Sequence, residues 1–156
     1  MNQRILEGIK VLDLTNVLSG PFTTLHLALL GAEVVKVGNP KDGDLARKLG
    51  ILPELNKRLM GTSFIAQNCN KKSITLNTKS AEGKAILLRM AKDADVVVEN
   101  FRPGVMDRLG LGYKVLAEAN PGLVYCAISG FGQTGPDALN PAYDQIIQGL
   151  SGEMAV

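Results

Sequence analysis

KVLDLTNVLSGPFTTLHLALLGAEVVKV, residues 10–37, decides the fold of this 156-residue chain. Residues 10–14 and 33–37 are short apolar runs typical of strands. Residues 21–30 between them predict a helix with Gly31 as its C-terminal cap. A strand, a helix and a strand in so short a segment form a βαβ unit, which implies parallel strands and a right-handed crossover.

The rest of the chain continues this alternation. Further strands are predicted at 73–77, 95–101 and 123–129, and further helices at 80–94, after Arg102, at 113–120 and over 143–150. The continuous Val run in 95–101 indicates burial on both faces, and 123–129 also reads as a buried strand. The sequence therefore predicts an α/β fold: a Rossmann-like open, mostly parallel sheet of four or five strands with helices on both faces.

The helix at 80–94 has the clearest pattern in the chain. Ser80 is a favourable N-cap, and Gly83 is a weak point in the helix. The expected apolar face consists of Ala85, Leu87, Leu88 and Ala91. The loop 38–50 is charged and should enter a short helix near Asp44, whereas 51–63 has no clear period.

Composition excludes several classes of function. The chain is 46% hydrophobic and 21% charged, as globular proteins are, and its net charge of +2 argues against nucleic-acid binding. No apolar run approaches the length of a membrane span, so we expect a soluble, cytoplasmic protein without membrane contact. The single His26 should lie on a helix face, and Cys69 and Cys126 should be buried free thiols, so no metal site is expected.

Four loops should meet at the carboxyl edge of the sheet, where α/β folds bind ligands. They are 16–21, 38–44, 99–104 and 129–136, all polar or rich in glycine. Loops are polar in general, so this pattern alone leaves ligand binding open. The basic residues near this edge, Lys71, Lys72, Lys79, Arg102 and Arg108, read as a scattered, solvated set, although Arg102 and Arg108 flank a short helix start that could hold phosphate. The first loop lacks the glycine fingerprint of dinucleotide-binding proteins, so an NAD-dependent oxidoreductase rests on fold analogy alone.

Six motifs in order resemble the amino-terminal part of one family. They are LEGIKVLDLTNVLSGP (6–21), LLGAEVVKV (29–37), GDLAR (43–47), NKKSITLN (70–77), ADVVVENFRPGVMDRLGLGY (94–113) and SGFGQTGP…PAYDQIIQGLSG (129–152). Together they resemble the family III CoA-transferases (CaiB/BaiF), the group of formyl-CoA and carnitine CoA-transferases. The resemblance covers nearly the whole chain.

The resemblance implies an activity and an assembly. Members of this family transfer CoA from an acyl-CoA to a carboxylic acid through an aspartyl-CoA thioester, and two chains interlock as a homodimer. Coenzyme A is thus a substrate and not a permanently bound cofactor. By this match the nucleophilic Asp would follow Val156, so residues 1–156 would form the amino-terminal, CoA-binding portion, with no catalytic residue of their own and the remainder of the family fold absent.

Ten positions match CoA-site positions of the family: Asn16, Val17, Leu18, Leu76, Lys79, Asn100, Phe101, Arg108, Tyr143 and Asp144. Of these, Tyr143 and Asp144 would face the thioester. The sequence departs from the family at 38–40, where GNP replaces a Glu followed by a basic residue or Pro, so the match does not extend to adenosine recognition there. Tyr143 stands where racemases of the family carry a catalytic His, and a tyrosine hydroxyl is a poor base at neutral pH, which favours a transferase over a racemase. A non-catalytic CoA-binding or subunit-interaction module is the alternative.

Overall fold

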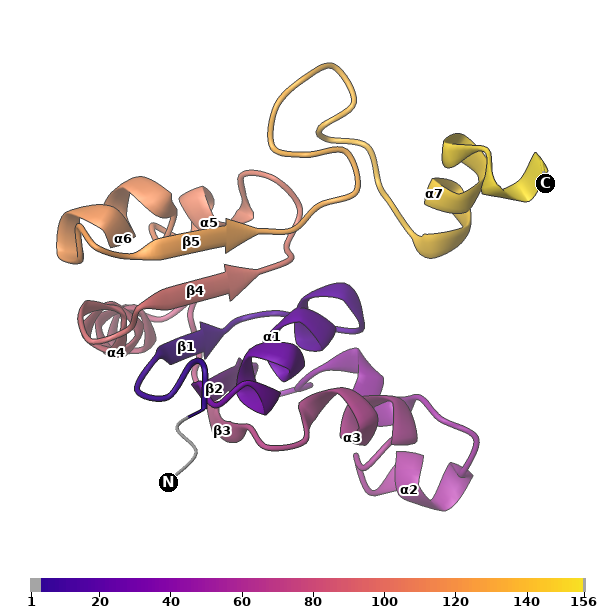
Figure 1. The fold of residues 1–156 in the computed structure, drawn as a ribbon, viewed down its shortest axis with the longest axis horizontal. Coiled ribbons are helices and arrows are strands. Elements are labelled where there is room, and N and C mark those ends of the chain that lie inside the picture. Colours follow the sequence, from indigo (N-terminus) through magenta and orange to yellow (C-terminus); the bar gives the residue numbers. More distant parts are fainter. Residues whose placement is uncertain (1–3, 156) are drawn as a thin grey trace.

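The computed structural model describes residues 4–155 and contains one five-stranded parallel sheet with helices on both faces (Figure 1). The strands are β1 (Lys10–Asp13), β2 (Glu33–Gly38), β3 (Lys72–Thr75), β4 (Val96–Glu99) and β5 (Val124–Ala127), in the order β3-β2-β1-β4-β5. The helices are α1 (Ser19–Leu29), α2 (Pro53–Lys57), α3 (Thr62–Asn68), α4 (Ala81–Lys92), α5 (Val105–Arg108), α6 (Tyr113–Ala119) and α7 (Asp144–Ser151), with short 3-10 helices η1 (Leu45–Lys48) and η2 (Glu153–Ala155). The Rossmann-like fold class predicted from the sequence is confirmed.

Two hydrophobic clusters cover the two faces of the sheet. The first joins Leu12 of β1 and Val97 of β4 to α4, α5 and α6, and the second joins Val11 and Val98 to Ala28 of α1. Neighbouring residues of one strand thus enter opposite clusters, as the pleat requires. Burial of the Val run on both faces is confirmed, because β1 and β5 flank β4 while helices cover it from both sides.

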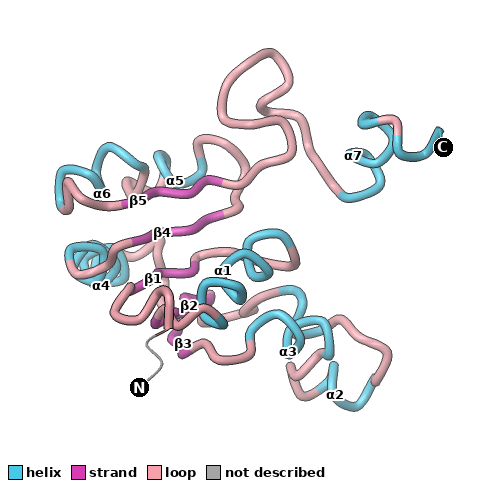
Figure 2. The backbone as a smooth tube through the Cα atoms, viewed as in Figure 1, coloured by secondary structure: helices cyan, strands magenta, loops and turns pink. Residues whose placement is uncertain are grey.

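The strand β5 corrects one prediction. It is an edge strand paired only with β4, and its first residue, Val124, is 59% exposed. An apolar run looks the same in an edge strand and a central strand, because hydrophobicity records the buried face and not the number of neighbouring strands. Figure 2 shows the long loop after β5 that leads away from the sheet to α7.

The segment without a clear period, 51–63, contains all of α2 and the start of α3. Each helix has only two turns or fewer and buries none of its residues, so neither leaves an amphipathic pattern in the sequence. The helix α3 is held against η1 by the Arg47 guanidinium, which lies 3.7 Å from the centre of the Phe64 ring.

The helix α4 confirms the Ser80 cap, whose hydroxyl accepts a hydrogen bond from the amide of Gly83 at 3.1 Å. The buried face differs from the expected one: Gly83, Leu87 and Ala91 are buried, whereas Ala85 is exposed. A Cβ atom at Gly83 would collide with the carbonyl oxygen of Asn77. Gly83 is therefore a close contact between α4 and the preceding loop and not only a weak helix former.

Neither cysteine is fully buried, and the single histidine is exposed. Cys69 is exposed and Cys126 is half-buried, so the expectation of two buried thiols is wrong; both are free. His26 is exposed on α1, as predicted, with its ring edge against Phe22. Within residues 4–155, none of the helices combines the length and the apolar character that crossing a bilayer needs.

We predict that Leu116→Ala lowers the free energy of unfolding by about 2–5 kcal/mol, because Leu116 of α6 is 1% exposed in the first cluster and its truncation leaves a cavity. The matched control is Val115→Ala in the same helix, at a position that is 38% exposed, where the change should stay within about 0.5 kcal/mol. Urea unfolding followed by far-ultraviolet circular dichroism measures both. Equal losses for the two variants would contradict this account of the core.

Candidate functional site

A cleft of about 690 Å³ opens at the carboxyl edge of β1, β2 and β3. Its floor is apolar and continues the first hydrophobic cluster: Leu14, Val37, Leu76, Leu87, Phe101, Val105, Met106, Leu109 and Leu111. Its rim is polar and comes from the loops after the strands: Asn16, Gly38, Asn39, Pro40, Lys41, Asp42, Gly43, Asn77, Thr78 and Lys79. The volume and the mixture of apolar floor and polar rim are those of small-molecule and cofactor sites.

A smaller cavity of about 190 Å³ lies beside the cleft, at the ends of β4 and β5. It is lined by segments 100–103, 128–130 and 140–143, together with Ala138. Phe101 lines both cavities and therefore separates them. The glycine-rich loop after β5 thus forms a wall of the second cavity.

The loop after β1 lies at the topological switch point of the sheet, between the ends of β1 and β4, where successive strands change from one side of β1 to the other. The Asn100 side chain holds this loop through two hydrogen bonds of 2.8 Å, because its Oδ1 accepts from the Asn16 amide and its Nδ2 donates to the Asn16 carbonyl. The next residue, Val17, has a φ of 67°, in the left-handed region that β-branched residues avoid at a cost of about 1–3 kcal/mol. Its amide donates to Asp44 Oδ1 at 3.0 Å.

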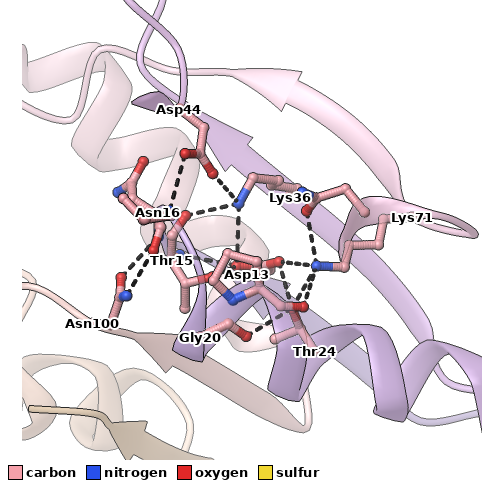
Figure 3. A network of polar contacts seen from close by, with 12 residues as sticks. Asp13, Thr15, Asn16, Gly20, Thr24, Lys36, Asp44, Lys71 and Asn100 are labelled. Carbon is pink, nitrogen blue, oxygen red and sulfur yellow. Dashed lines mark hydrogen bonds and ion pairs between the residues drawn. The ribbon is translucent and has the colours of Figure 1, made fainter. Parts of the chain in front are cut away.

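Four buried charges lie behind this loop, on the α1 side of the sheet (Figure 3). Lys36 Nζ lies 3.2 Å from Asp44 Oδ2 and 3.8 Å from Asp13 Oδ1, and donates a hydrogen bond to the Thr15 carbonyl at 2.8 Å. Lys71 Nζ lies 3.0 Å from Asp13 Oδ2. All four charged side chains are at most 3% exposed, and two carboxylates balance two ammonium groups.

Most donor and acceptor atoms of these four charged side chains also form hydrogen bonds with neighbouring groups. The Thr24 hydroxyl donates to Asp13 Oδ2 at 2.6 Å, and the Thr15 amide donates to Asp13 Oδ1 at 2.9 Å. Besides Asp13, the Lys71 ammonium group has three more acceptors within hydrogen-bond distance, and its three N–H groups are shared among them: the Pro21 carbonyl, the Thr24 hydroxyl and the Asn68 side-chain carbonyl. The contact between Lys36 and Asp44 Oδ2 is an ion pair without hydrogen-bond alignment.

The balance of burial and charge determines the ionisation of this cluster. Burial would raise the pKa of Asp13, but Lys36 and Lys71, with the hydrogen bonds from the two threonines, hold it below its ordinary value. Burial lowers the pKa of Lys71, and the Asp13 carboxylate opposes this shift. Asp13 is therefore the ionised centre around which the cations gather.

A third buried carboxylate, Glu99, lies at the end of β4. It accepts hydrogen bonds from the Phe101 amide at 2.7 Å and from the Tyr125 hydroxyl at 3.2 Å. Burial raises the pKa of Glu99 even though both hydrogen bonds oppose the rise. Burial and the neighbouring Glu99 also raise the pKa of the Tyr125 hydroxyl and of the Cys126 thiol.

The structure brings together some of the ten sequence-predicted site residues. Asn16, Leu76, Lys79 and Phe101 line the large cleft, and Asn100, Phe101 and Tyr143 line the smaller cavity. The others, Val17, Leu18, Arg108 and Asp144, line neither of these two cavities and are exposed. Asp144 begins α7, where its carboxylate accepts a hydrogen bond from Gln148 at 2.7 Å.

Sequence reasoning missed the charge cluster and placed Lys71 on the solvated surface, which is wrong. Lys71 meets Asp13 across 58 positions of sequence, and nothing in the local pattern shows this contact. A signal was nevertheless present: Asp13 and Lys36 are opposite charges inside two apolar strands, and the βαβ unit places them side by side as register partners. Asp44 could have been found only as the cap of the short helix, a role it does have, since it accepts from the Ala46 amide at 2.9 Å.

Comparison with known proteins assigns the chain to a family. A profile of CoA-transferase family III matches residues 6–156. The chain belongs to CoA-transferase family III. The acetyl-CoA:oxalate CoA-transferase of Acetobacter aceti is 51% identical over 148 residues, which cover 95% of this chain and 37% of that protein. The succinyl-CoA:glutarate CoA-transferase of Homo sapiens is 44% identical over 155 residues, which cover 99% of this chain and 35% of that protein.

Two solved structures agree with the fold. A hypothetical protein from Mycobacterium tuberculosis superposes with a TM-score of 0.89 at 38% identity, over 99% of this chain and 42% of that chain. A CAIB/BAIF family protein from Brucella suis superposes with a TM-score of 0.85 at 40% identity, over 96% of this chain and 40% of that chain. The chain therefore spans little more than a third of the length of its curated relatives.

We predict that Lys71→Met destabilises the family III fold by about 3–5 kcal/mol, because it leaves Asp13 buried with only the more distant Lys36 as a counter-charge. The adjacent Lys72→Met is the matched control. Lys72 forms an exposed ion pair with Glu33, so its loss should change the free energy of unfolding very little. Urea unfolding compares the two variants, and a similar stability for both would contradict the assigned role of Lys71.

We predict that Glu99→Gln changes how stability depends on pH. The folded pKa of Glu99 is raised above its ordinary 4.5, so the contribution of Glu99 to stability is full below about pH 4.5 and is lost as the pH rises through the folded pKa. The Gln side chain does not titrate. The free energy of unfolding of the variant, relative to that of the unsubstituted chain, should therefore increase as the pH rises through the folded pKa of Glu99, by about 1.4 kcal/mol in total for each pKa unit by which folding raises that pKa. Urea unfolding from pH 4.5 to 7.5 measures this, with the exposed Glu118→Gln as the charge-matched control. A difference between Glu99→Gln and the unsubstituted chain that is independent of pH would contradict the assignment.

Proposed function

We propose that residues 1–156 form the CoA-binding part of a family III CoA-transferase. The observation that carries the proposal is the 690 Å³ cleft at the carboxyl edge, with an apolar floor and a basic rim, in a chain of this family. CoA combines a charged nucleotide end with a long, weakly polar pantetheine arm. A site for it needs cations at one end and apolar surface along its length, and this cleft supplies both.

Electrostatics favour the rim near β3 as the position of the phosphates. Lys79 and Lys41 line this rim, with Asp42 as the one carboxylate among the lining residues. Lys79 lies next to Ser80, the N-cap of α4, a helix of 12 residues whose N-terminal end carries the positive end of the helix dipole. Charge-assisted hydrogen bonds from a lysine and a nearby helix N-terminus together stabilise bound phosphate.

The chemistry of the whole protein follows from the family. We infer that it transfers CoA from an acyl-CoA to a carboxylic acid, and that the nucleophilic carboxylate is not among residues 1–156. The relatives are named for the carboxylic acids oxalate and glutarate, which supports a small carboxylic acid as acceptor. Tyr143, on the wall of the smaller cavity, supports a transferase over a racemase by the same resemblance. Homodimeric assembly and a cytoplasmic location remain predictions, and a non-catalytic CoA-binding module remains the alternative.

We predict that the 156-residue chain binds CoA, measured by isothermal titration calorimetry at 50 mM salt. Lys79→Ala should weaken binding about tenfold, since a hydrogen bond to a charged group contributes about 1.5–3 kcal/mol. Lys92→Ala, which removes an exposed lysine at the opposite end of α4, is the control and should leave affinity unchanged. Absence of CoA binding by the unsubstituted chain would overturn the proposal.

A CoA-transfer assay tests whether the nucleophile lies outside residues 1–156, as the proposal states. The chain incubated with acetyl-CoA or succinyl-CoA and with oxalate or glutarate should show no transfer, because the proposal places the nucleophile outside residues 1–156. Chromatography of the CoA esters measures the products. Transfer by the purified chain would show that the nucleophile lies within it, contrary to the proposed division of roles.

A further inference from the structure

The loop after β1 is held by side chains that the proposed CoA site does not require as ligand contacts. Both main-chain groups of Asn16 are bonded to the Asn100 side chain, and the Val17 amide is bonded to Asp44. These backbone groups are therefore occupied by the protein. What Asn16 offers to the cleft that it lines is its side chain.

Asp44 links the two loops that form neighbouring parts of the cleft rim. It is 2% exposed, and its Oδ1 accepts from Val17 in the first loop and from Ala46 at the start of η1. Its Oδ2 lies against Lys36, which is itself fixed by the Thr15 carbonyl. Asp44 thus fixes the end of the rim segment 39–43 and the backbone of Val17 at the same time.

Val17 is the strained point of this arrangement. Its φ of 67° is unfavourable for a β-branched residue, and the local sequence offers no glycine at this position. On its N-terminal side Thr15 packs so closely on Gly20 that no side chain would fit there, and on its other side α1 begins at Ser19. Two side chains restrain the loop here: Asn100 bonds both main-chain groups of Asn16, and Asp44 accepts from the Val17 amide. Figure 3 shows Asn16 between Asn100 and Asp44.

We propose that Asp44 and Asn100 are positioning residues for CoA binding: they hold Val17 in the left-handed conformation and thereby keep Asn16 at the wall of the cleft. This inference rests on the proposed function and deepens it. It also changes the role of Asn100, which the family resemblance suggests as a direct CoA contact. Both terminal atoms of its amide already have backbone partners within the protein.

Glycine at position 17 provides the decisive test, because glycine adopts positive φ without strain and needs no restraint. Asp44→Ala and Asn100→Ala should each weaken CoA binding by the 156-residue chain about tenfold, an effect equivalent to about 1.4 kcal/mol. Adding Val17→Gly to either variant should recover at least about threefold of the lost affinity. A residue that contacts CoA directly would show no such recovery, since the contact stays absent.

The matched control is Leu59→Gly. Leu59 has a φ of 58°, close to that of Val17, but lines neither cavity. It should relieve a similar backbone strain and raise the stability of the Asp44→Ala chain without restoring CoA affinity. Asn100→Ala removes no charge and retains the buried cluster, so it tests the proposal even if Asp44→Ala folds poorly.

Calorimetric titration of CoA, with hydrogen exchange of the Val17 amide measured by NMR, completes the experiment. We expect Asp44→Ala to accelerate exchange at Val17 and weaken binding together. Affinity that survives both alanine substitutions, or that Leu59→Gly restores as well as Val17→Gly does, would overturn the positioning role. Absence of CoA binding by the unsubstituted chain would instead overturn the proposed function, so the two failures are distinguishable.

Discussion

The ion pair between Asp13 and Lys36 is the constraint on which the carboxyl edge of the sheet depends. The two residues are register partners on β1 and β2 and are almost completely buried. Their charges are stable there only because Lys71 and Asp44 complete a balanced set. A shift of β1 by one residue would turn Asp13 to the other face of the sheet and leave the buried Lys71 without its carboxylate partner, so the cluster opposes such a slip strongly.

The same cluster explains why distant segments of the chain meet behind the loop after β1. Lys71 precedes β3, and Asp44 follows β2, so the charges tie the beginning of one strand and the ends of two others to the loop after β1. Apolar packing alone would fix the layers but not the path of these loops, because hydrophobic contact has no direction. Hydrogen bonds and ion pairs are directional. Here they connect Lys36 of β2 to Asp44, and Asp44 to the Val17 amide.

The parts of this fold that local chemistry encodes could be predicted from the sequence. Alternation, caps and the Val run gave the strands, the βαβ unit and α4, and Gly31 has the positive φ of 112° that a helix-ending glycine needs. The parts that depend on contacts across the chain could not. Lys71 looks like any surface lysine until β3 is in place, and Gly83 looks like a defect until Asn77 lies against it. Of the ten predicted site residues, four line the cleft: Asn16, Leu76, Lys79 and Phe101. The buried charges behind the loop after β1 were missed.

The absence of a glycine fingerprint after β1 also has a structural account. In dinucleotide-binding folds the glycines let a pyrophosphate approach the start of the first helix. Here Thr15 packs on Gly20 at that point and Asn100 reaches Asn16, so protein groups occupy the start of α1. The cleft lies instead on the other face of the sheet, since Leu14 and Val37 line it while their strand neighbours Asp13 and Lys36 point to α1. Under the proposed function, the CoA phosphates in this cleft would meet Lys79 in the loop between β3 and α4, which would place anion binding in the third βα loop and not in the first.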